Sequence, residues 1–216
     1  MTETCGLALT VTGIGPEPYA LTPALSARVA LTTPADEPVH AIALRAQVRI
    51  EPYRRGYSDE ESTGLTDLFG PRERWHDTQR SFLWMHCATM VPGFRESAEV
   101  ELPLPCTYDF EVAGSKYLHA LREGTVPLLF LFSGTVFVKG GKGFAIRNVP
   151  WDRDCGYDMP ISVWRELMAG HFPDSGWLRL SRTTLDALST YKSRRGLLGY
   201  DDAMAELLAA GTEAAS

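Results

Sequence analysis

The sequence predicts a mainly β, mixed α+β fold, in which an antiparallel β-sandwich is followed by three short helices. Apolar and polar residues alternate over 39–52 and 97–104, which is typical of strands with one buried and one solvated face. Residues 126–151 contain two long apolar runs separated by a glycine-rich turn, which indicates a β-hairpin. After Pro160 the apolar residues recur with helical spacing instead.

These patterns divide the chain into a β-sandwich over 6–151 and a helical C-terminal extension over 152–211. The first helix of the extension carries the apolar stripe Trp164, Leu167 and Met168. Helices shorter than about 12–15 residues are marginal in water by themselves. We therefore expect the extension to pack on the sandwich.

The first strand of the hairpin is apolar on both of its faces. A strand with this pattern can bury its side chains only when both faces are covered. We therefore expect it to be a central strand, and its far end to reach solvent at the turn Gly140-Gly141-Lys142-Gly143. The side chains that alternate between the two faces are Leu128, Phe130 and Phe132 on one and Leu129 and Leu131 on the other.

The other elements follow from local signals. Residues 7–11 and 24–32 are β-prone and lie among prolines and glycines, which suits edge strands and turns. Residues 80–91 resume strand character, and 113–123 read as a short helix that ends at Gly124.

Two further helices are expected near the C-terminus. Ser181 is a suitable N-cap for one of them, and Gly196 is a suitable stop. Asp201 is expected to cap the last one.

A charged insertion at 53–79 interrupts the strand pattern. Long insertions in compact domains are either functional or loosely ordered. Its tryptophan, Trp75, stands beside His76 and Asp77. Packing of Trp75 against the sandwich is favoured over a binding role, because large aromatic side chains are most often buried.

Composition excludes several classes of partner. The formal net charge is −6 and the basic residues are scattered, whereas a nucleic-acid binder needs a concentrated basic face. No apolar run approaches the roughly 20 residues that span a bilayer, and no export signal is visible at the N-terminus. We therefore expect a cytoplasmic protein, with the oligomeric state left open.

No catalytic, cofactor-binding or metal-binding constellation is apparent. The chain has no G-x-S-x-G elbow, and its histidines lack the spacing of metal ligands. The four cysteines contain no C-x-x-C pair and are expected to be free thiols. They are Cys5, Cys87, Cys106 and Cys155.

The chain contains the strings DLFGPRERW (67–75), PLPCTYDFEVAGSKYLHAL (103–121), VPLLFLFSGTVF (126–137), VPWD (149–152) and VWRELM (163–168). These strings resemble a bacterial family of unknown function over about residues 8–208. Genes of that family often lie beside those of an uptake nickel–iron hydrogenase, so the resemblance implies a supporting role in hydrogenase assembly or maturation. It supplies no catalytic residue.

Two functions of different class are therefore expected. The first is a non-catalytic accessory or interaction protein, whose partners would be hydrogenase subunits or accessory proteins. The alternative is a small-ligand-binding β-sandwich that uses the 53–79 insertion. An enzyme is less favoured, since the sequence shows no recognisable acid/base pair or nucleophile. The residues expected at an interaction surface are Trp75, His76, Asp77, Trp151 and Asp152.

Overall fold

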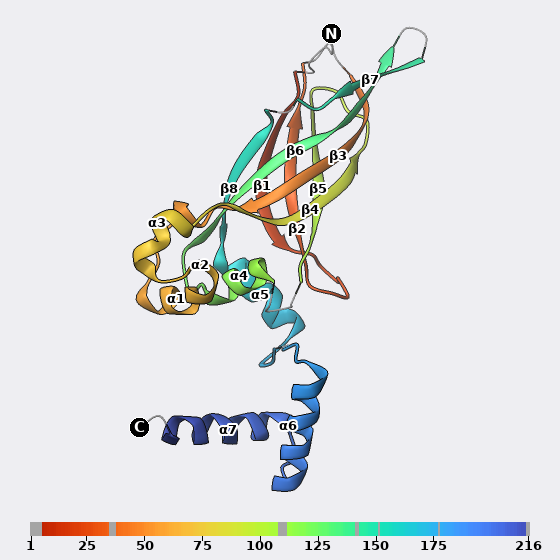
Figure 1. Ribbon diagram of the computed structural model, residues 1–216. Helices are drawn as coiled ribbons and strands as arrows, with labels where there is room; N and C mark the ends of the chain where they lie inside the picture. Colours follow the sequence, from red (N-terminus) through yellow and green to blue (C-terminus); the bar gives the residue numbers. More distant parts are fainter. Residues whose placement is uncertain are drawn as a thin grey trace. The chain divides into compact units, whose positions relative to one another are not determined.

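The computed structural model describes residues 6–34, 38–107, 112–140, 143–150, 152–176 and 178–214 (Figure 1). The chain divides into two compact units, Met1–Trp177 and Leu178–Ser216. The first holds two antiparallel sheets and several helices, which confirms the mixed α+β class.

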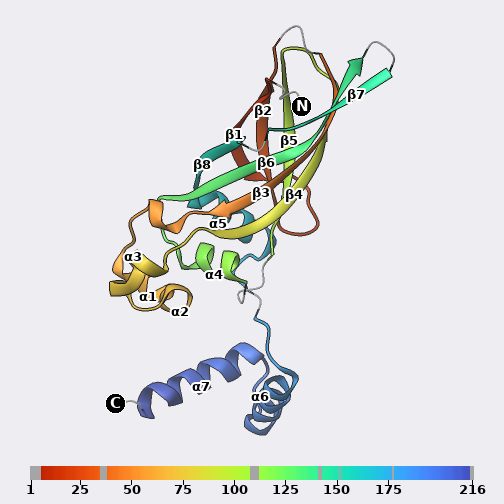
Figure 2. The same ribbon diagram turned by 45° about the horizontal axis from the view of Figure 1, so that its top comes forward.

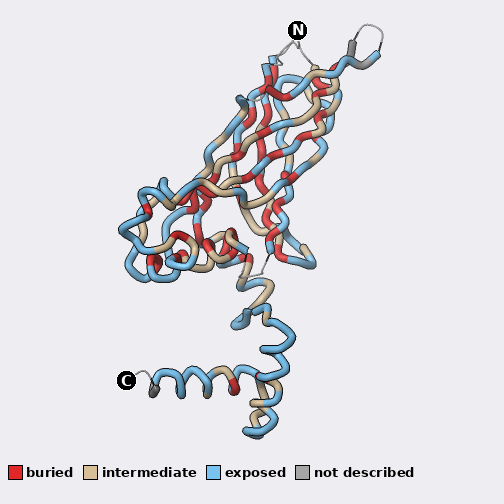
Figure 3. The backbone as a smooth tube through the Cα atoms, viewed as in Figure 1, coloured by how far each residue is buried: buried red, intermediate tan, exposed pale blue. Residues whose placement is uncertain are grey.

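The smaller sheet has three strands in the order β1-β2-β5. They are β1 (Ala8–Pro16), β2 (Ala24–Thr32) and β5 (Ser97–Pro105), and both pairings are antiparallel. Buried and exposed residues alternate along β2 and β5, as Figure 3 shows for the sheets in general. One face of this sheet therefore belongs to the core.

The larger sheet has five strands: β3 (Val39–Ile50), β4 (Phe82–Val91), β6 (Thr125–Gly140), β7 (Gly143–Asn148) and β8 (Asp154–Pro160). The order is β4-β3-β6-β7, and β8 also pairs with β6. Strand β6 bonds β3 along one edge and is long enough to bond β8 and then β7 along the other. The predicted hairpin is β6–β7, in which Gly140 pairs with Gly143. Gly141 and Lys142 of its turn lie outside the described residues.

The inner face of β6 is buried, whereas its outer face is covered only in part. Phe130 and Leu128 are fully buried, and Phe132 nearly so. Leu129 and Leu131, on the opposite face, are half-buried. The expectation that both faces would be covered is thus met only on the inner face. On the outer face, Leu129 and Leu131 pair with Arg49 and Gln47 of β3 and with Gly156 and Asp154 of β8. Their neighbours are therefore polar side chains and a glycine rather than a second apolar layer.

Strand β8 corrects the expectation that a helical region begins at residue 152. The chain after Asp152 first forms β8, whose residues from Asp154 to Pro160 pair with the first half of β6. Without β8, that edge of β6 would leave its backbone groups unpaired. Along β8 the residues Cys155, Tyr157 and Met159 alternate with exposed ones, so a strand signal is present but short.

The 53–79 insertion is folded into short helical turns. These are η1 (Pro52–Arg54), α1 (Asp59–Gly64), α2 (Thr66–Phe69), η2 (Arg72–Arg74) and α3 (Trp75–Thr78). Ser58 and Glu61 form a reciprocal capping box at the start of α1. Gly70, with positive φ, ends α2.

Two helices of the first unit lie close to the insertion (Figures 1 and 2). They are α4 (Ala113–Ala120), which precedes β6, and α5 (Ile161–His171), which follows β8. Tyr117 and Leu118 of α4 and Trp164 and Leu167 of α5 are buried in the same hydrophobic cluster as the two sheets. No helix in the described part of the chain is both long and apolar enough to cross a membrane.

The second unit consists of α6 (Arg182–Arg195) and α7 (Tyr200–Ala214). Ser181 caps α6 by accepting a hydrogen bond from the Thr184 backbone, and Gly196 ends it in the left-handed conformation, as the sequence predicts. Helix α7 begins at Tyr200, one residue before the predicted cap. An ion pair between Arg195 and Glu206 joins the two helices.

Candidate functional site

Trp75 lies in the core and does not contribute its ring to a surface. Its side chain is only 7% exposed. Its indole Nε1 donates to the carbonyl of Gly70 at 2.9 Å, and its ring meets those of Tyr57 and Phe69 edge to face. This is the packing role that the sequence favours for Trp75.

The other described residues expected at an interaction surface lie on α3 and just before β8. His76 and Asp77 are 73% and 69% exposed and contact each other at 3.1 Å on α3. Asp152 contacts Arg153 before the start of β8, at the opposite end of that strand from α5. Trp151 lies outside the described residues.

The described cysteines are free thiols in apolar or half-buried surroundings. Burial raises the pKa of Cys87 to about 11 and that of Cys106 to about 12, so both stay protonated at neutral pH. Within the described residues, no three His, Cys, Asp or Glu side chains gather closely enough to hold a metal ion.

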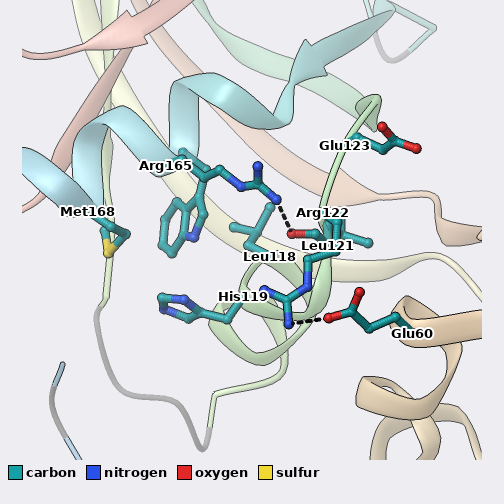
Figure 4. A pocket seen from close by; sticks show the side chains of 9 residues that line it. Glu60, Leu118, His119, Leu121, Arg122, Glu123, Arg165 and Met168 are labelled. Carbon is teal, nitrogen blue, oxygen red and sulfur yellow. Dashed lines mark hydrogen bonds and ion pairs between the residues drawn. The ribbon is translucent and has the colours of Figure 1, made fainter. Parts of the chain in front are cut away.

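A pocket of about 610 Å³ lies between α4, α5 and the 53–79 insertion (Figure 4). Helix α4 and the connection to β6 provide one wall, α5 provides another, and α1 contributes a single residue. The lining residues are Glu60, Leu118, His119, Leu121, Arg122, Glu123, Trp164, Arg165 and Met168.

The inner lining of the pocket is apolar and aromatic. Leu118 and Leu121 are buried, as is Trp164, which is 2% exposed. The Trp164 ring lies edge to face with His119, 5.4 Å between centroids, and with Trp84, 6.5 Å. Trp84 in turn rests on Gly114 of α4, where a Cβ would come within 2.6 Å of the Trp84 ring. This close approach holds α4 beside the tryptophan pair.

Trp164 carries a buried hydrogen-bond donor. Among the described residues, its Nε1 has no hydrogen-bond partner. A buried donor left without an acceptor costs about 1–3 kcal/mol. The Trp164 Nε1 is closed to water in this structure, so a ligand or an ordered water satisfies it only after a small shift of the surrounding side chains.

Charged side chains surround the apolar lining. Arg165 Nη2 donates to the backbone carbonyl of Leu121 at 3.2 Å, and Arg122 Nη2 contacts Glu60 Oε1 at 3.0 Å (Figure 4). Arg122 and Glu60 are largely exposed, so their ion pair is weak and can exchange partners. Within the part of the chain that the structure describes, Arg165 has no carboxylate partner.

His119 is held in its neutral form. It is half-buried against the Trp164 ring. Desolvation by burial lowers the pKa of its imidazole below the usual value. At neutral pH it therefore adds an uncharged polar ring to the pocket rather than a positive charge.

A buried ion pair holds the rim of the pocket in place. Glu61 of α1 is 2% exposed and pairs with Arg55 at 3.0 Å. Its Oε1 also accepts from the backbone N–H of Arg122 at 2.7 Å. Arg55 reaches the same connection, because its guanidinium donates to the carbonyls of Glu123 and Thr125. The insertion is thus fastened to the segment that supplies Arg122 and Glu123 to the pocket.

A second hollow of about 490 Å³ lies on the outer face of β4-β3-β6. Its polar side chains, Arg45, Gln47, His86 and Ser133, are all exposed. It therefore lacks the buried polar group that distinguishes the pocket between α4 and α5.

The sequence pattern does not predict this pocket. It places Trp164 and Met168 in a packing stripe and gives His119 no role. The residues of α4 that line the pocket lie more than forty positions before Trp164 and Met168, so no local spacing connects the two walls. The signal present in the sequence is the insertion, which is expected to be a ligand site and supplies Glu60.

Comparison with known proteins places the chain in a family. A model described as a family of unknown function (DUF6084) matches residues 4–216, so the chain belongs to that family. No curated protein sequence matches the chain.

Two solved structures show weak similarity. A putative late embryogenesis abundant protein has 11% identity and a TM-score of 0.31, with 71% of this chain and 70% of that chain covered. A β-glucosidase from Kluyveromyces marxianus has 9% identity and a TM-score of 0.26, with 72% of this chain and 15% of that chain covered. Neither likeness carries information on the function of this chain.

Proposed function

We propose that this member of the DUF6084 family is a non-catalytic protein that binds a small ligand in the pocket between α4 and α5. The observation that carries the proposal is the buried Nε1 of Trp164, which lines the pocket and has no acceptor among the described residues. The volume of about 610 Å³ lies within the range of small-molecule sites, which is about 300–1,000 Å³.

Binding is favoured over catalysis by the character of the ionisable groups at the pocket. Its two carboxylates, Glu60 and Glu123, stand on the exposed rim, and Glu60 is engaged by Arg122. A general acid or base needs a positioned group whose pKa is matched to proton transfer. Within the described residues, the pocket contains no carboxylate in a buried position.

The 53–79 insertion supports the site rather than forming it. It contributes Glu60 to the rim, and its Glu61 holds the backbone of Arg122 by accepting a hydrogen bond from the Arg122 N–H. This modifies the ligand-binding alternative drawn from the sequence, in which the insertion itself was the binding element.

We also infer that the two sheets pack face to face as a β-sandwich. Their buried residues form one hydrophobic cluster, and β4 lies beside β5 while β1 lies beside β8. A pair of sheets with one shared core is the usual way to bury the inner faces of antiparallel strands.

An accessory role in a cytoplasmic hydrogenase system stays a prediction that the family resemblance implies. A binding protein without catalytic groups is compatible with it. Affinity purification from the native host is the test: enrichment of hydrogenase subunits or their accessory proteins is the expected result, and their absence contradicts the role.

Fluorescence titration tests ligand binding with two probes, 8-anilinonaphthalene-1-sulfonate and N-phenyl-1-naphthylamine. At least one probe should bind with a stoichiometry near one. Met168 is half-buried and lines the pocket, so the larger side chain of Met168→Trp should fill the pocket and abolish that binding. Met90→Trp is the matched control, because Met90 is exposed on β4. If neither probe binds, or if Met168→Trp binds both as the wild type does, the pocket is not a ligand site.

A further inference from the structure

The polar groups that face the pocket are mostly hydrogen-bond donors. Arg165 uses one N–H for the carbonyl of Leu121, which leaves the rest of its guanidinium available. Trp164 Nε1 can only donate and has no acceptor among the described residues. A ligand that satisfies these groups must therefore supply acceptors.

The acceptors at the pocket do not compensate for these donors. The carboxylate of Glu60 is taken by Arg122. Figure 4 shows the carboxylate of Glu123 pointing away from the other side chains of the site. The guanidinium of Arg165 is thus the charge left to be neutralised, and planar guanidinium groups bind acid groups with two parallel hydrogen bonds.

A second guanidinium stands ready to assist. Arg122 and Glu60 are 58% and 70% exposed, and an ion pair in that environment contributes about 0–1 kcal/mol. An acid group that enters the pocket can therefore displace Glu60 from Arg122 at little cost. The exchange would give the ligand two positively charged partners.

The remaining lining requires an apolar body. Leu118 and Trp164 are buried, and Met168 is half-buried beside them on the α5 wall. An ion that is small and fully hydrated, such as inorganic phosphate, would leave the accessible part of Met168 in contact with water. A larger molecule with an apolar or aromatic part would cover it.

We propose that the ligand is an amphipathic organic anion, whose acid group binds Arg165 and whose apolar part lies against Leu118, Trp164 and Met168. This inference rests on the proposed binding function and narrows the class of ligand. It assigns Arg165 as the residue that selects for negative charge.

The two probes of the binding test separate charge from shape, because they share their aromatic rings and only one carries a sulfonate. Arg165→Leu should weaken binding of the sulfonate about tenfold or more, as expected for the loss of a charge-assisted hydrogen bond. The same variant should leave binding of the neutral amine within about twofold. Arg165→Lys should give an intermediate affinity for the sulfonate.

Three controls complete the experiment. Arg45→Leu removes an exposed arginine from the outer face of β3 and should leave both affinities unchanged. Trp164→Phe keeps an aromatic ring but removes the indole N–H, and it should weaken binding of the sulfonate more than binding of the amine. Added salt should lower the affinity for the sulfonate but not the affinity for the neutral amine.

The outcomes distinguish the two proposals. If Arg165→Leu lowers the affinity for both probes equally, the anion preference is wrong and the pocket is still a binding site. The same conclusion follows if the wild-type protein binds the neutral amine but not the sulfonate. Binding of both probes that survives Met168→Trp overturns the site itself. An affinity for the sulfonate that is unchanged in Arg165→Leu also overturns the role of Arg165.

Discussion

Replacement of Glu61 by glutamine should destabilise the protein strongly. Glu61→Gln keeps the shape of the side chain but removes the charge that faces Arg55, whose own side chain is 10% exposed. The oxygens of Glu61 accept from Arg55 and from the backbone N–H groups of Ser58 and Arg122. An amide has one acceptor oxygen, so its NH₂ group would face donors.

The magnitude follows from the burial of the pair. Removal of one partner of a buried ion pair costs about 3–5 kcal/mol, because the other charge stays buried without compensation. We expect about 3 kcal/mol for Glu61→Gln, since one oxygen remains. For a chain of this size that corresponds to a fall in melting temperature of roughly 6–12 °C.

The assay is urea unfolding of the variant beside Glu60→Gln. Glu60 is the adjacent residue of the same type and also pairs with an arginine, but it is largely exposed. Its replacement should change the unfolding free energy by less than about 1 kcal/mol. Equal midpoints for the two variants would refute the reasoning that burial makes the Glu61–Arg55 pair important.

The pH dependence of the same pair has a defined sign. Burial alone raises the pKa of Glu61, but hydrogen bonds from the Arg122 and Ser58 backbones and the charge of Arg55 outweigh it, so the net pKa lies below the usual value of 4.5. The stabilisation is therefore present above the pKa of the unfolded chain and is lost as the pH falls through the folded pKa. The difference in stability between wild type and Glu61→Gln should narrow in acid.

Other predictions concern the core, the thiols and the second unit. Phe130→Ala should lower the unfolding free energy by about 3–5 kcal/mol, because Phe130 is fully buried; an unchanged urea midpoint would contradict its central place. Cys87 and Cys106, whose pKa values are raised by burial, should react slowly with a disulfide reagent in the native protein and fully after denaturation. If the helices α6 and α7 pack on the first unit, as the sequence predicts, a chain that ends at residue 177 should melt at a lower temperature than the full chain. Equal melting temperatures for the truncated and the full chain would contradict that packing.

Elements with local signals are predictable from the sequence alone. Alternation of apolar and polar residues predicts β3 and β5, because successive side chains on a strand point to opposite faces. The glycine-rich turn predicts the hairpin β6–β7. Ser181 and Gly196 predict the limits of α6, because capping depends only on the chain within a few residues of the helix end.

The way in which distant segments combine depends on tertiary packing and is not encoded in local patterns. Strand β8 forms because the free edge of β6 supplies its hydrogen bonds. The sequence of 154–160 does not specify β6 as the strand with which it pairs. The pocket arises where Leu118 of α4 and Trp164 of α5 line one hollow, although the strands β6, β7 and β8 separate them along the chain. Periodicity specifies which face of an element is apolar. It does not specify the partner of that face, because many partners would bury the same side chains equally well.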